Sequence, residues 1–413
     1  MDRHYRSYKT EIDPIDEQIK KIETDFTTCK MVFNLYLIIA LNQYKKEGTF
    51  GDHDAFLDWF YSSYLKTAKY RINYPKDLNY DAIRRVTKNV EKVMKKYING
   101  EINEPKCKDL KYGQIKLYFT SGNNNDYSVI CERHRIYIPE FGWIRLKEKG
   151  YFLPSNADHQ IISGTISKKA GRYYISLNYN VSDSLIKKEI NERGIYREPI
   201  GIDLGISHFA VLSDGRVYEN INYDESVKRL EKKIHRKQRA LDRKIQAAKL
   251  AGRDYTQGSH YNINVLELQK LYKRLDEKRL DCINKIVGEI VKSHPAYVAI
   301  EDLHIQEMVS DRRFSRAISD LFLREFRVRL IKKSRSNGIE VRVIDKFFPS
   351  SKRCSCCGRI NHDLKLSDRV FKCECGFEVD RDFNASINIR DCKEYYIAKV
   401  DDDIVHLQYG PTK

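Results

Sequence analysis

The sequence predicts a multidomain protein of mixed class, with an α+β part followed by an α/β domain. Three observations predict it. The hydrophobic pattern changes from a helical period to a period of two near residue 114, strands and helices alternate from about residue 199, and four cysteines cluster near the C-terminal end. Such changes indicate separate cores. At 413 residues the chain is long enough for two or three of them.

The first predicted element is a long helix near the N-terminus. Asp13-Pro14 is typical of an N-cap with proline at the first helical position. Behind it, apolar residues from Ile15 to Tyr36 recur at steps of four and three, as on one buried helix face. Further helices are expected over about 55–70 and 81–99. We therefore expect residues 14–104 to form a helical lobe.

A strand pattern follows the helices. Ile115, Leu117 and Phe119 alternate with polar residues, and two longer alternating runs flank Lys168-Lys169-Ala170-Gly171, which is typical of a hairpin turn. This pattern predicts a β-barrel-like domain. A further strand is expected over about 5–12, so residues 1–13 and 105–198 would form one domain with the helical lobe inserted in it.

A third domain is expected to begin near Pro199. Its strands are predicted at 200–206, 209–212, 216–218, 296–301 and 339–344. Its helices are predicted at about 225–250, 265–292 and 316–336. Strands that alternate with helices after a three-stranded meander resemble the ribonuclease H type of α/β fold. This domain is expected to comprise residues 199–350 and 380–393. Residues 351–379 are assigned to a cysteine module and residues 394–413 to a C-terminal tail.

Composition indicates an intracellular protein that binds a polyanion. The net charge is +17, from 75 Lys and Arg against 58 Asp and Glu, which favours nucleic acid over a merely soluble basic protein. No secretory signal is visible at the N-terminus, and the longest apolar run, from Met31 to Leu41, is too short to span a bilayer. The ten cysteines are therefore expected to be metal ligands and reduced thiols in a cytoplasm.

Three acidic motifs far apart in the chain are candidates for a metal site. Asp203 lies inside an otherwise apolar strand between two glycines, Glu301 ends another apolar strand, and Asp380 and Asp382 precede a predicted helix. Carboxylates that converge on paired Mg²⁺ ions can hydrolyse a phosphodiester. Each residue also has an ordinary explanation: a turn cap for Asp203, an exposed strand end for Glu301, and an N-cap for either later aspartate. The residues alone leave the choice between Asp380 and Asp382 open.

The cysteine cluster predicts a zinc ribbon. Cys354 and Cys357 are separated by two residues, and Cys373 and Cys375 by one. Four thiolates can close a tetrahedral zinc site that stabilises a small module. The second pair is one residue shorter than usual, and Cys356 could substitute for a neighbour. A structural role is expected.

Two basic segments are candidates for contacts with nucleic-acid phosphates. The alternative for both is a solvated helix face. The residues chosen are Lys228, Lys232 and Arg236 in the first, and Arg324, Arg327, Lys352 and Arg353 in the second.

Several of these motifs together resemble TnpB, the transposon-encoded nuclease family that is ancestral to type V CRISPR effectors. The resemblance is carried by Gly201-Ile202-Asp203-Leu204-Gly205, by Ile300-Glu301-Asp302-Leu303, by the segment from Phe348 to Gly358, and by Cys375-Gly376-Phe377 with the following Asp380-Arg381-Asp382-Phe383-Asn384-Ala385. It is close from about 199 to 390 and looser before that. The chain departs from the family in its short second cysteine pair and in Ser386, where alanine is common.

The resemblance implies a wedge β-barrel domain, a helical recognition lobe, a RuvC-like nuclease domain and a zinc-bearing module that binds target nucleic acid. It implies an endonuclease that cuts DNA paired with a guide RNA beside a short flanking motif, with one protein per RNA. The family's catalytic acids, ligands of two Mg²⁺ ions, fall on Asp203, Glu301 and Asp382. The alternatives are a compact CRISPR effector of the same lineage, a guide-directed DNA binder that does not cut, and a transposase or accessory protein.

Overall fold

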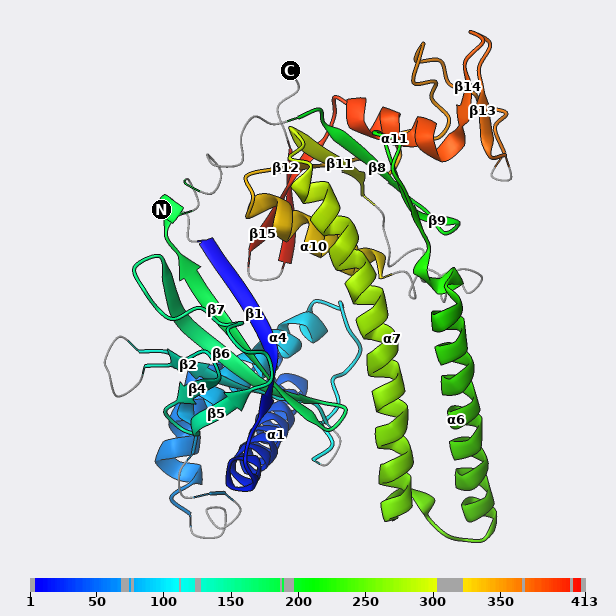
Figure 1. The fold of residues 1–413 in the computed structure, drawn as a ribbon. Helices are drawn as coiled ribbons and strands as arrows, with labels where there is room; N and C mark the ends of the chain where they lie inside the picture. Colours follow the sequence, from blue (N-terminus) through cyan, green and yellow to red (C-terminus); the bar gives the residue numbers. More distant parts are fainter. Residues whose placement is uncertain are drawn as a thin grey trace. The chain divides into compact units, whose positions relative to one another are not determined.

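The computed structural model describes residues 4–67, 74–75, 78–110, 113–122, 128–185, 188, 197–302, 322–365, 368–401 and 404–409. The chain divides into two compact units, Met1–Leu185 and Ile186–Lys413. Each unit contains both helices and a seven-stranded sheet (Figure 1). The predicted mixed class with several sheets is thereby confirmed.

The first unit is built on an antiparallel sheet with the strand order β2-β6-β7-β1-β5-β4-β3. Two residues with positive φ, Ala170 and Gly171, turn the chain between β6 and β7, where the sequence predicts a hairpin. The strands are β1 (His4–Asp13), β2 (Lys116–Thr120), β3 (Ile130–Cys131), β4 (Arg135–Ile138), β5 (Gly142–Leu146), β6 (His159–Lys169) and β7 (Arg172–Val181).

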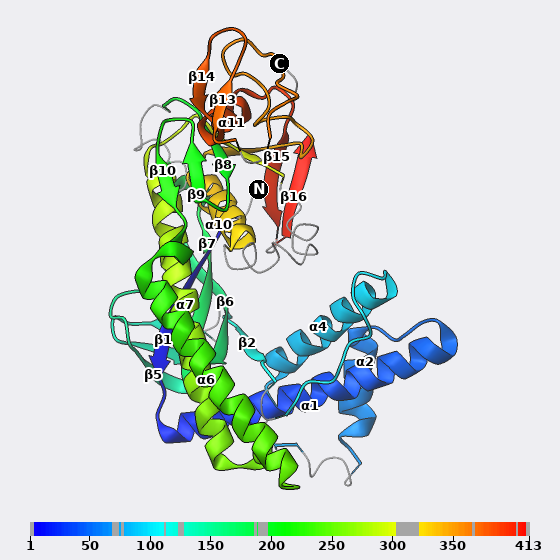
Figure 2. The ribbon, with the colours of Figure 1, turned by 90° about the vertical axis from the view of Figure 1, so that its right-hand side faces the viewer.

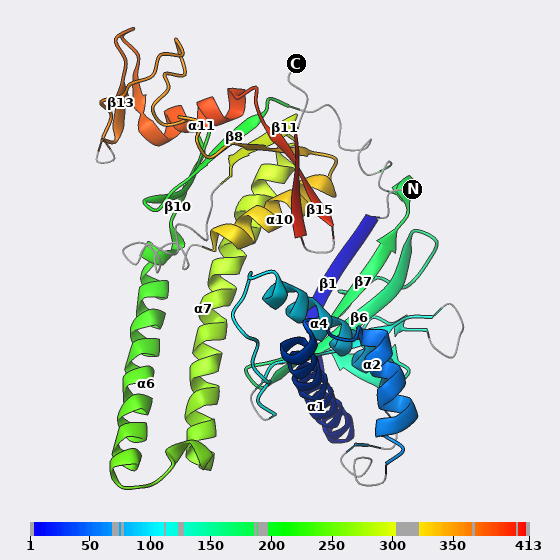
Figure 3. The same cartoon turned by 180° about the vertical axis from the view of Figure 1, so that it is seen from behind.

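Helices lie in the chain between β1 and β2 of this sheet (Figure 3). They are α1 (Asp16–Glu47), α2 (His53–Trp59) with the following π-helical turn η1 (Phe60–Tyr64), and α4 (Tyr80–Ile98). The predicted cap of the first helix is wrong. Asp13 pairs with Arg145 as the last residue of β1, and the N-cap is Ile15, whose N–H donates to the Gln18 side chain.

One hydrophobic core joins the helices and the sheet of the first unit. Its buried residues come from α1, α2 and α4 and from the strands alike. α1 is the one helix among the described residues that is long and apolar enough to cross a membrane, and 56% of its most apolar window is buried within the protein. This degree of burial is that of a core helix.

A buried acid in α1 leads to a first prediction. Asp25 is 5% exposed, its Oδ2 has no hydrogen-bond partner, and burial raises its pKa from 3.8 to about 6. Lys21 opposes this shift and Glu140 adds to it. The folded state therefore binds more protons than the unfolded state between these two values, so stability falls as the pH rises through them.

Asp25→Asn is expected to raise the melting temperature at about pH 7.5 and to change it little at about pH 4, because Asn carries no charge to bury. Thermal unfolding at both pH values tests this. Asp58→Asn, an exposed position on α2, is the control and should behave as the wild type. An equal effect of Asp25→Asn at both pH values would contradict the prediction.

The second unit contains a mixed sheet with the order β10-β9-β8-β11-β12-β15-β16. Figure 2 labels β8, β9 and β10 on one side of this sheet and β15 and β16 on the other. The central strands β8, β11 and β12 are parallel, and the outer strands on both sides are antiparallel to their neighbours. The strands are β8 (Ile200–Leu204), β9 (His208–Leu212), β10 (Val217–Glu219), β11 (Tyr297–Glu301), β12 (Glu340–Ile344), β15 (Tyr396–Asp401) and β16 (Ile404–Tyr409). The last two strands lie in the C-terminal tail, for which no element was predicted.

Within the part of the second unit that the structure describes, four α-helices and a small hairpin accompany the sheet. α6 (Glu225–Leu250) and α7 (Ser259–Lys292) form a long antiparallel pair, and α7 starts six residues earlier than predicted. α10 (Leu323–Arg335) matches the second part of the helix predicted at 316–336, whose first part lies outside the described residues. The others are α11 (Arg381–Asp391) and the hairpin of β13 (Val370–Lys372) and β14 (Glu378–Asp380).

The sheet of the second unit carries helices on both faces. Val298 and Ile300 of β11 pack in the core formed with α7 and α10, whereas Ala299 packs with Ile389 of α11. Side chains alternate along a strand. The sequence position of a residue in β8 or β11 therefore decides which of the two helical layers its side chain faces.

Candidate active site and four-cysteine site

Asp203 and Glu301 end two neighbouring strands of the second unit. β8 and β11 are parallel, and Ile202 is the partner of Ile300 in their register. The next residue in each strand is the acid. The carboxyl ends of parallel strands meet at one edge of a sheet, where α/β proteins place their ligands. The structure thus brings two carboxylates together that are 98 residues apart in the sequence.

Both carboxylates belong to the α11 face of the sheet. Gly201 contacts α11, and Asp203 lies two positions further on the same face. Glu301 has the same relation to Ala299, which packs with Ile389. Asp302 has a different environment, since its Oδ1 lies 2.6 Å from Nη1 of Arg327 on α10. Glu301 and Asp302 therefore point to opposite sides, as successive residues of an extended chain do.

Gly201 allows α11 to lie close against β8. A Cβ atom at this position would be 2.0 Å from the backbone oxygen of Ser386 and 2.5 Å from the backbone nitrogen of Arg390. No side chain fits at these distances. Gly201, two residues before Asp203, therefore allows α11, the helix that carries Asp382, to lie against β8.

Gly201→Ala is consequently expected to destabilise the protein by about 1–3 kcal/mol or more, because the atoms in the way are backbone atoms. Chemical denaturation, with cleavage activity measured alongside, tests this. Gly258→Ala is the control, since Gly258 has a negative φ and a Cβ atom at this position would meet nothing closer than 3.5 Å. Equal stability of the two variants would contradict the close approach of α11.

The two aspartates at the start of α11 have different structural roles. Asp380 is the N-cap, and its Oδ1 accepts hydrogen bonds from the N–H groups of Asp382 and Phe383, both at 3.0 Å. The cap thus uses the exposed Asp380 and leaves the carboxylate of Asp382 in the first turn available. Of the two residues that the sequence could not separate, Asp382 is the better candidate for the site.

The acids form a negative cluster. Burial, followed by the charges of Glu301, Asp382 and Asp380, raises the pKa of Asp203 well above its usual range, and Arg381 opposes the shift. Burial also raises the pKa of Glu301, while a hydrogen bond from Ser350 lowers it. Carboxylates placed together without enough positive charge repel each other, which a bound cation would relieve.

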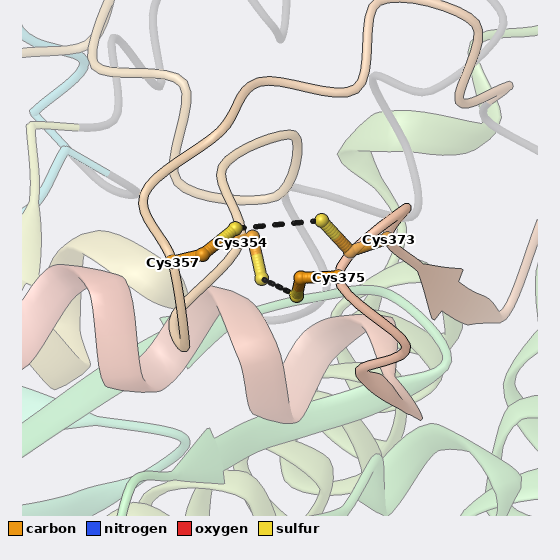
Figure 4. Close-up of side chains that lie close together, drawn as sticks. All are labelled: Cys354, Cys357, Cys373 and Cys375. Carbon is orange, nitrogen blue, oxygen red and sulfur yellow. Dashed lines mark hydrogen bonds between the residues drawn. The ribbon is translucent and has the colours of Figure 1, made fainter.

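The four cysteines converge on one point from two loops (Figure 4). Their sulfur atoms all lie within 4.8 Å of one another, and they are the one group of three or more metal-ligating side chains found this close among the described residues. The Cys354 and Cys375 sulfurs are 3.8 Å apart, and those of Cys357 and Cys373 are 3.6 Å apart. The short spacing of the second pair does not prevent convergence. Cys356 is exposed and stands outside the group.

These distances suit a tetrahedral metal ion. Zn–S bonds of about 2.3 Å at tetrahedral angles place two sulfurs about 3.8 Å apart. A backbone hydrogen bond involving Arg359 lowers the pKa of Cys357 to about 7, whereas hydrogen bonds among the neighbouring thiols raise the pKa values of Cys373 and Cys375. One thiol of the cluster thus ionises before the others, and a bound cation would favour the thiolate form of all four. The cluster can therefore hold a metal ion.

The predicted phosphate-binding residues divide into two groups. Lys228, Lys232 and Arg236 are exposed along α6 at intervals of four, opposite the residues buried against α7. Arg324 and Arg353 are also exposed and Lys352 is half-buried. Arg327 differs because its side chain is 16% exposed and paired with Asp302.

Three residues without an assigned role in the sequence analysis connect the two sites. They are Ser350, Asn384 and Asn388, all buried. Polar residues at i and i+4 on an otherwise apolar helix face are a signal that sequence inspection could have used for the two asparagines. For Ser350 no comparable signal exists, because its burial follows from the loop conformation.

Comparisons with known proteins found two matching family models and several similar relatives. The OrfB_IS605 family model, described as a probable transposase, matches residues 179–312, and the Cas12f1-like TNB domain model matches 324–389. A Streptomyces pristinaespiralis protein named RNA-guided DNA endonuclease is 31% identical over 238 residues, 57% of this chain and 54% of that relative. InsQ of Escherichia coli K12, named likewise, is 23% identical over 404 residues, 94% of this chain and 92% of InsQ.

A solved structure has the same overall fold. The chain superposes on Cas12f1 from a cryo-EM structure of a Cas12f1–sgRNA–target DNA complex with a TM-score of 0.56, at 14% identity, over 91% of this chain and 83% of that one. Fold and site define a mixed α+β protein with a carboxylate cluster and a four-cysteine site in one unit. The chain is similar to a transposase family over 179–312, to the Cas12f1-like TNB domain over 324–389, and to InsQ over almost its whole length.

Proposed function

We propose that this protein is an RNA-guided DNA endonuclease. The observation that carries the proposal is the meeting of Asp203, Glu301 and Asp382 on one face of the second unit's sheet, in a chain whose relatives are named RNA-guided DNA endonucleases. In this proposal the sheet is a RuvC-like domain, the cysteine segment is a zinc ribbon that binds target nucleic acid, and the first unit combines a wedge β-barrel with a recognition lobe.

Asp203, Glu301 and Asp382 would hold two Mg²⁺ ions. Two ions about 3.5–4 Å apart are the usual arrangement in nucleases of this kind. When bound, such ions activate a water and stabilise the leaving oxygen of a phosphodiester. The protein's part is to fix three oxygen donors on two strands and one helix, with Asp380 kept apart as the helix cap.

The partners would be a guide RNA and double-stranded target DNA, with one protein per RNA and an intracellular location. Cas12f1 in the structure of similar fold is bound to both kinds of nucleic acid. The net charge of +17 supplies the attraction for phosphates.

The decisive experiment uses the purified complex with its guide RNA, Mg²⁺ and a plasmid library that carries the guide's target beside randomised flanks. Cleavage of a flank-defined subset supports the proposal. Intact plasmid with guided binding would mean a programmable DNA binder, and RNA-independent strand joining would mean a transposase. A CRISPR array or a transposon end beside the gene separates the remaining alternatives.

The three exposed basic residues at intervals of four on α6 lead to a further prediction. Lys228→Ala, Lys232→Ala and Arg236→Ala combined are expected to weaken nucleic-acid binding and to reduce the salt dependence of log K by up to about 0.9 for each phosphate that the variant no longer neutralises. Filter binding at several salt concentrations measures this. Lys237→Ala, at a lysine that already pairs with Glu267, is the control. If the dependence of log K on salt is unchanged in the triple variant, these three residues form a solvated helix face that does not contact phosphates.

A further inference from the structure

A buried hydroxyl connects the loop before the cysteines to the acid at the end of β11. Ser350 is 6% exposed, and its Oγ donates a hydrogen bond to Oε1 of Glu301. A glutamate side chain has three rotatable bonds, so a carboxylate at a strand end takes many positions unless a partner fixes it. One fixed donor restricts these positions and leaves further lone pairs for a cation.

Ser350 is in turn held by α11. Nδ2 of Asn388, which is 6% exposed, donates to the backbone oxygen of Ser350 at 2.8 Å and to that of Arg353 at 2.6 Å. Buried amide groups make such bonds because leaving them unpaired is costly. The position of the Ser350 backbone therefore follows the position of the helix that begins with Asp382.

The same helix fastens the first cysteine loop. Asn384, one turn before Asn388, is fully buried; its Nδ2 donates to the backbone oxygen of Arg353 at 2.7 Å, and its Oδ1 accepts from the N–H of Ser355 at 3.0 Å. Cys354 lies between these two bonded residues. A continuous set of hydrogen bonds thus runs from the four-cysteine site through α11 to Glu301.

We propose that Ser350 is a positioning residue for Glu301 at the cation site, and that Asn384 and Asn388 make this positioning depend on the folded cysteine module. The inference rests on the proposed nuclease function only in assigning Glu301 to a cation. If this network only stabilised the loop that contains Ser350, the hydrogen bonds of the two asparagines to backbone oxygens would be sufficient. Such a network would not need a hydroxyl directed at a carboxylate of the candidate site.

The test measures Mn²⁺ binding to the full-length protein–guide complex by electron paramagnetic resonance, with the single-turnover cleavage rate and target-DNA affinity measured in parallel. Ser350→Ala is expected to lower the Mn²⁺ affinity and the cleavage rate about 10–100-fold, as changes next to metal ligands do, without weakening DNA binding. Ser350→Thr, which keeps the hydroxyl, should restore both.

Ser386→Ala is the matched control. Ser386 is a fully buried serine on α11 whose hydroxyl donates only to the Phe383 backbone oxygen, and alanine is common there in the resembling family. The control should match the wild type in Mn²⁺ affinity. Unchanged Mn²⁺ affinity in Ser350→Ala would overturn the positioning role.

A second variant keeps the inference testable if Ser350→Ala fails to fold. Asn388→Asp replaces the donor by an acceptor facing two backbone oxygens. It is expected to lower both the Mn²⁺ affinity and the zinc content, and an unchanged Mn²⁺ affinity would overturn the dependence on the module. Failure of the proposed function looks different, since the wild type would then bind Mn²⁺ without cutting DNA.

Discussion

Asp203→Asn is expected to lower the rate of DNA cleavage strongly and at the same time to raise the melting temperature of the metal-free protein. The carboxylate is a proposed ligand of both catalytic ions, so its loss should lower the cleavage rate on the order of 10³-fold. Without metal, however, the same carboxylate is surrounded by protein and faces Glu301, Asp382 and Asp380. Removing its charge removes that repulsion and the cost of its burial.

The two effects are measured separately. Cleavage is followed with the guide complex, and melting is followed with and without Mg²⁺. The wild type should gain stability with Mg²⁺ concentration because the ion binds only the folded state, and Asp203→Asn should gain less. Asp242→Asn, an exposed position on α6, should match the wild type throughout. An Asp203→Asn variant that cleaves at the wild-type rate, or one that melts lower without metal, would contradict this account of the cluster.

Cys354→Ser is expected to release the metal and unfold the cysteine module. Cys354 is 1% exposed, and a hydroxyl in its place cannot supply the thiolate that completes the tetrahedron. Structural zinc contributes about 10–16 kcal/mol to the folding of small zinc-finger peptides, far more than a short hairpin such as β13–β14 can supply. Loss of metal should therefore be accompanied by loss of structure from about 351 to 379 and by loss of cleavage.

Cys356→Ser is the matched control, since Cys356 lies two residues away but outside the converging group. Metal analysis of the purified variants should give one zinc per wild-type and Cys356→Ser chain and much less for Cys354→Ser. Hydrogen exchange locates the unfolded segment. If Cys356→Ser loses the metal and Cys354→Ser keeps it, the ligand set is wrong.

Much of the second unit could be predicted from the sequence because its local signals agree with its packing. The strands around Asp203 and Glu301 are apolar runs bounded by polar residues, and their predicted bounds differ from the observed ones by at most two residues. α6 shows its buried face as a regular repeat, and the structure places it at the predicted 225–250. In these elements propensity and tertiary burial indicate the same structure.

Other features depend on interactions that no local pattern contains. The cap of α1 lies at Ile15 because Asp13 is used in a ladder with Arg145, far along the chain. β15 has no strong strand pattern, and it is held by pairing with β16 on one side and β12 on the other. Two further features likewise depend on the folded arrangement. They are the use of Asp380, and not Asp382, as the helix cap, and the hydrogen bond from Ser350 to Glu301.

The length of α7 has a mechanical consequence. This single helix of 34 residues extends for about 50 Å, and its two ends belong to different cores. Leu275 packs with α6, whereas Ile286, Val287 and Ile290 pack under the sheet that ends in Glu301. An α-helix is stiff over this distance. A force on the part of α7 that packs with α6 is therefore transmitted as a torque to the face of the sheet that the other end of α7 covers.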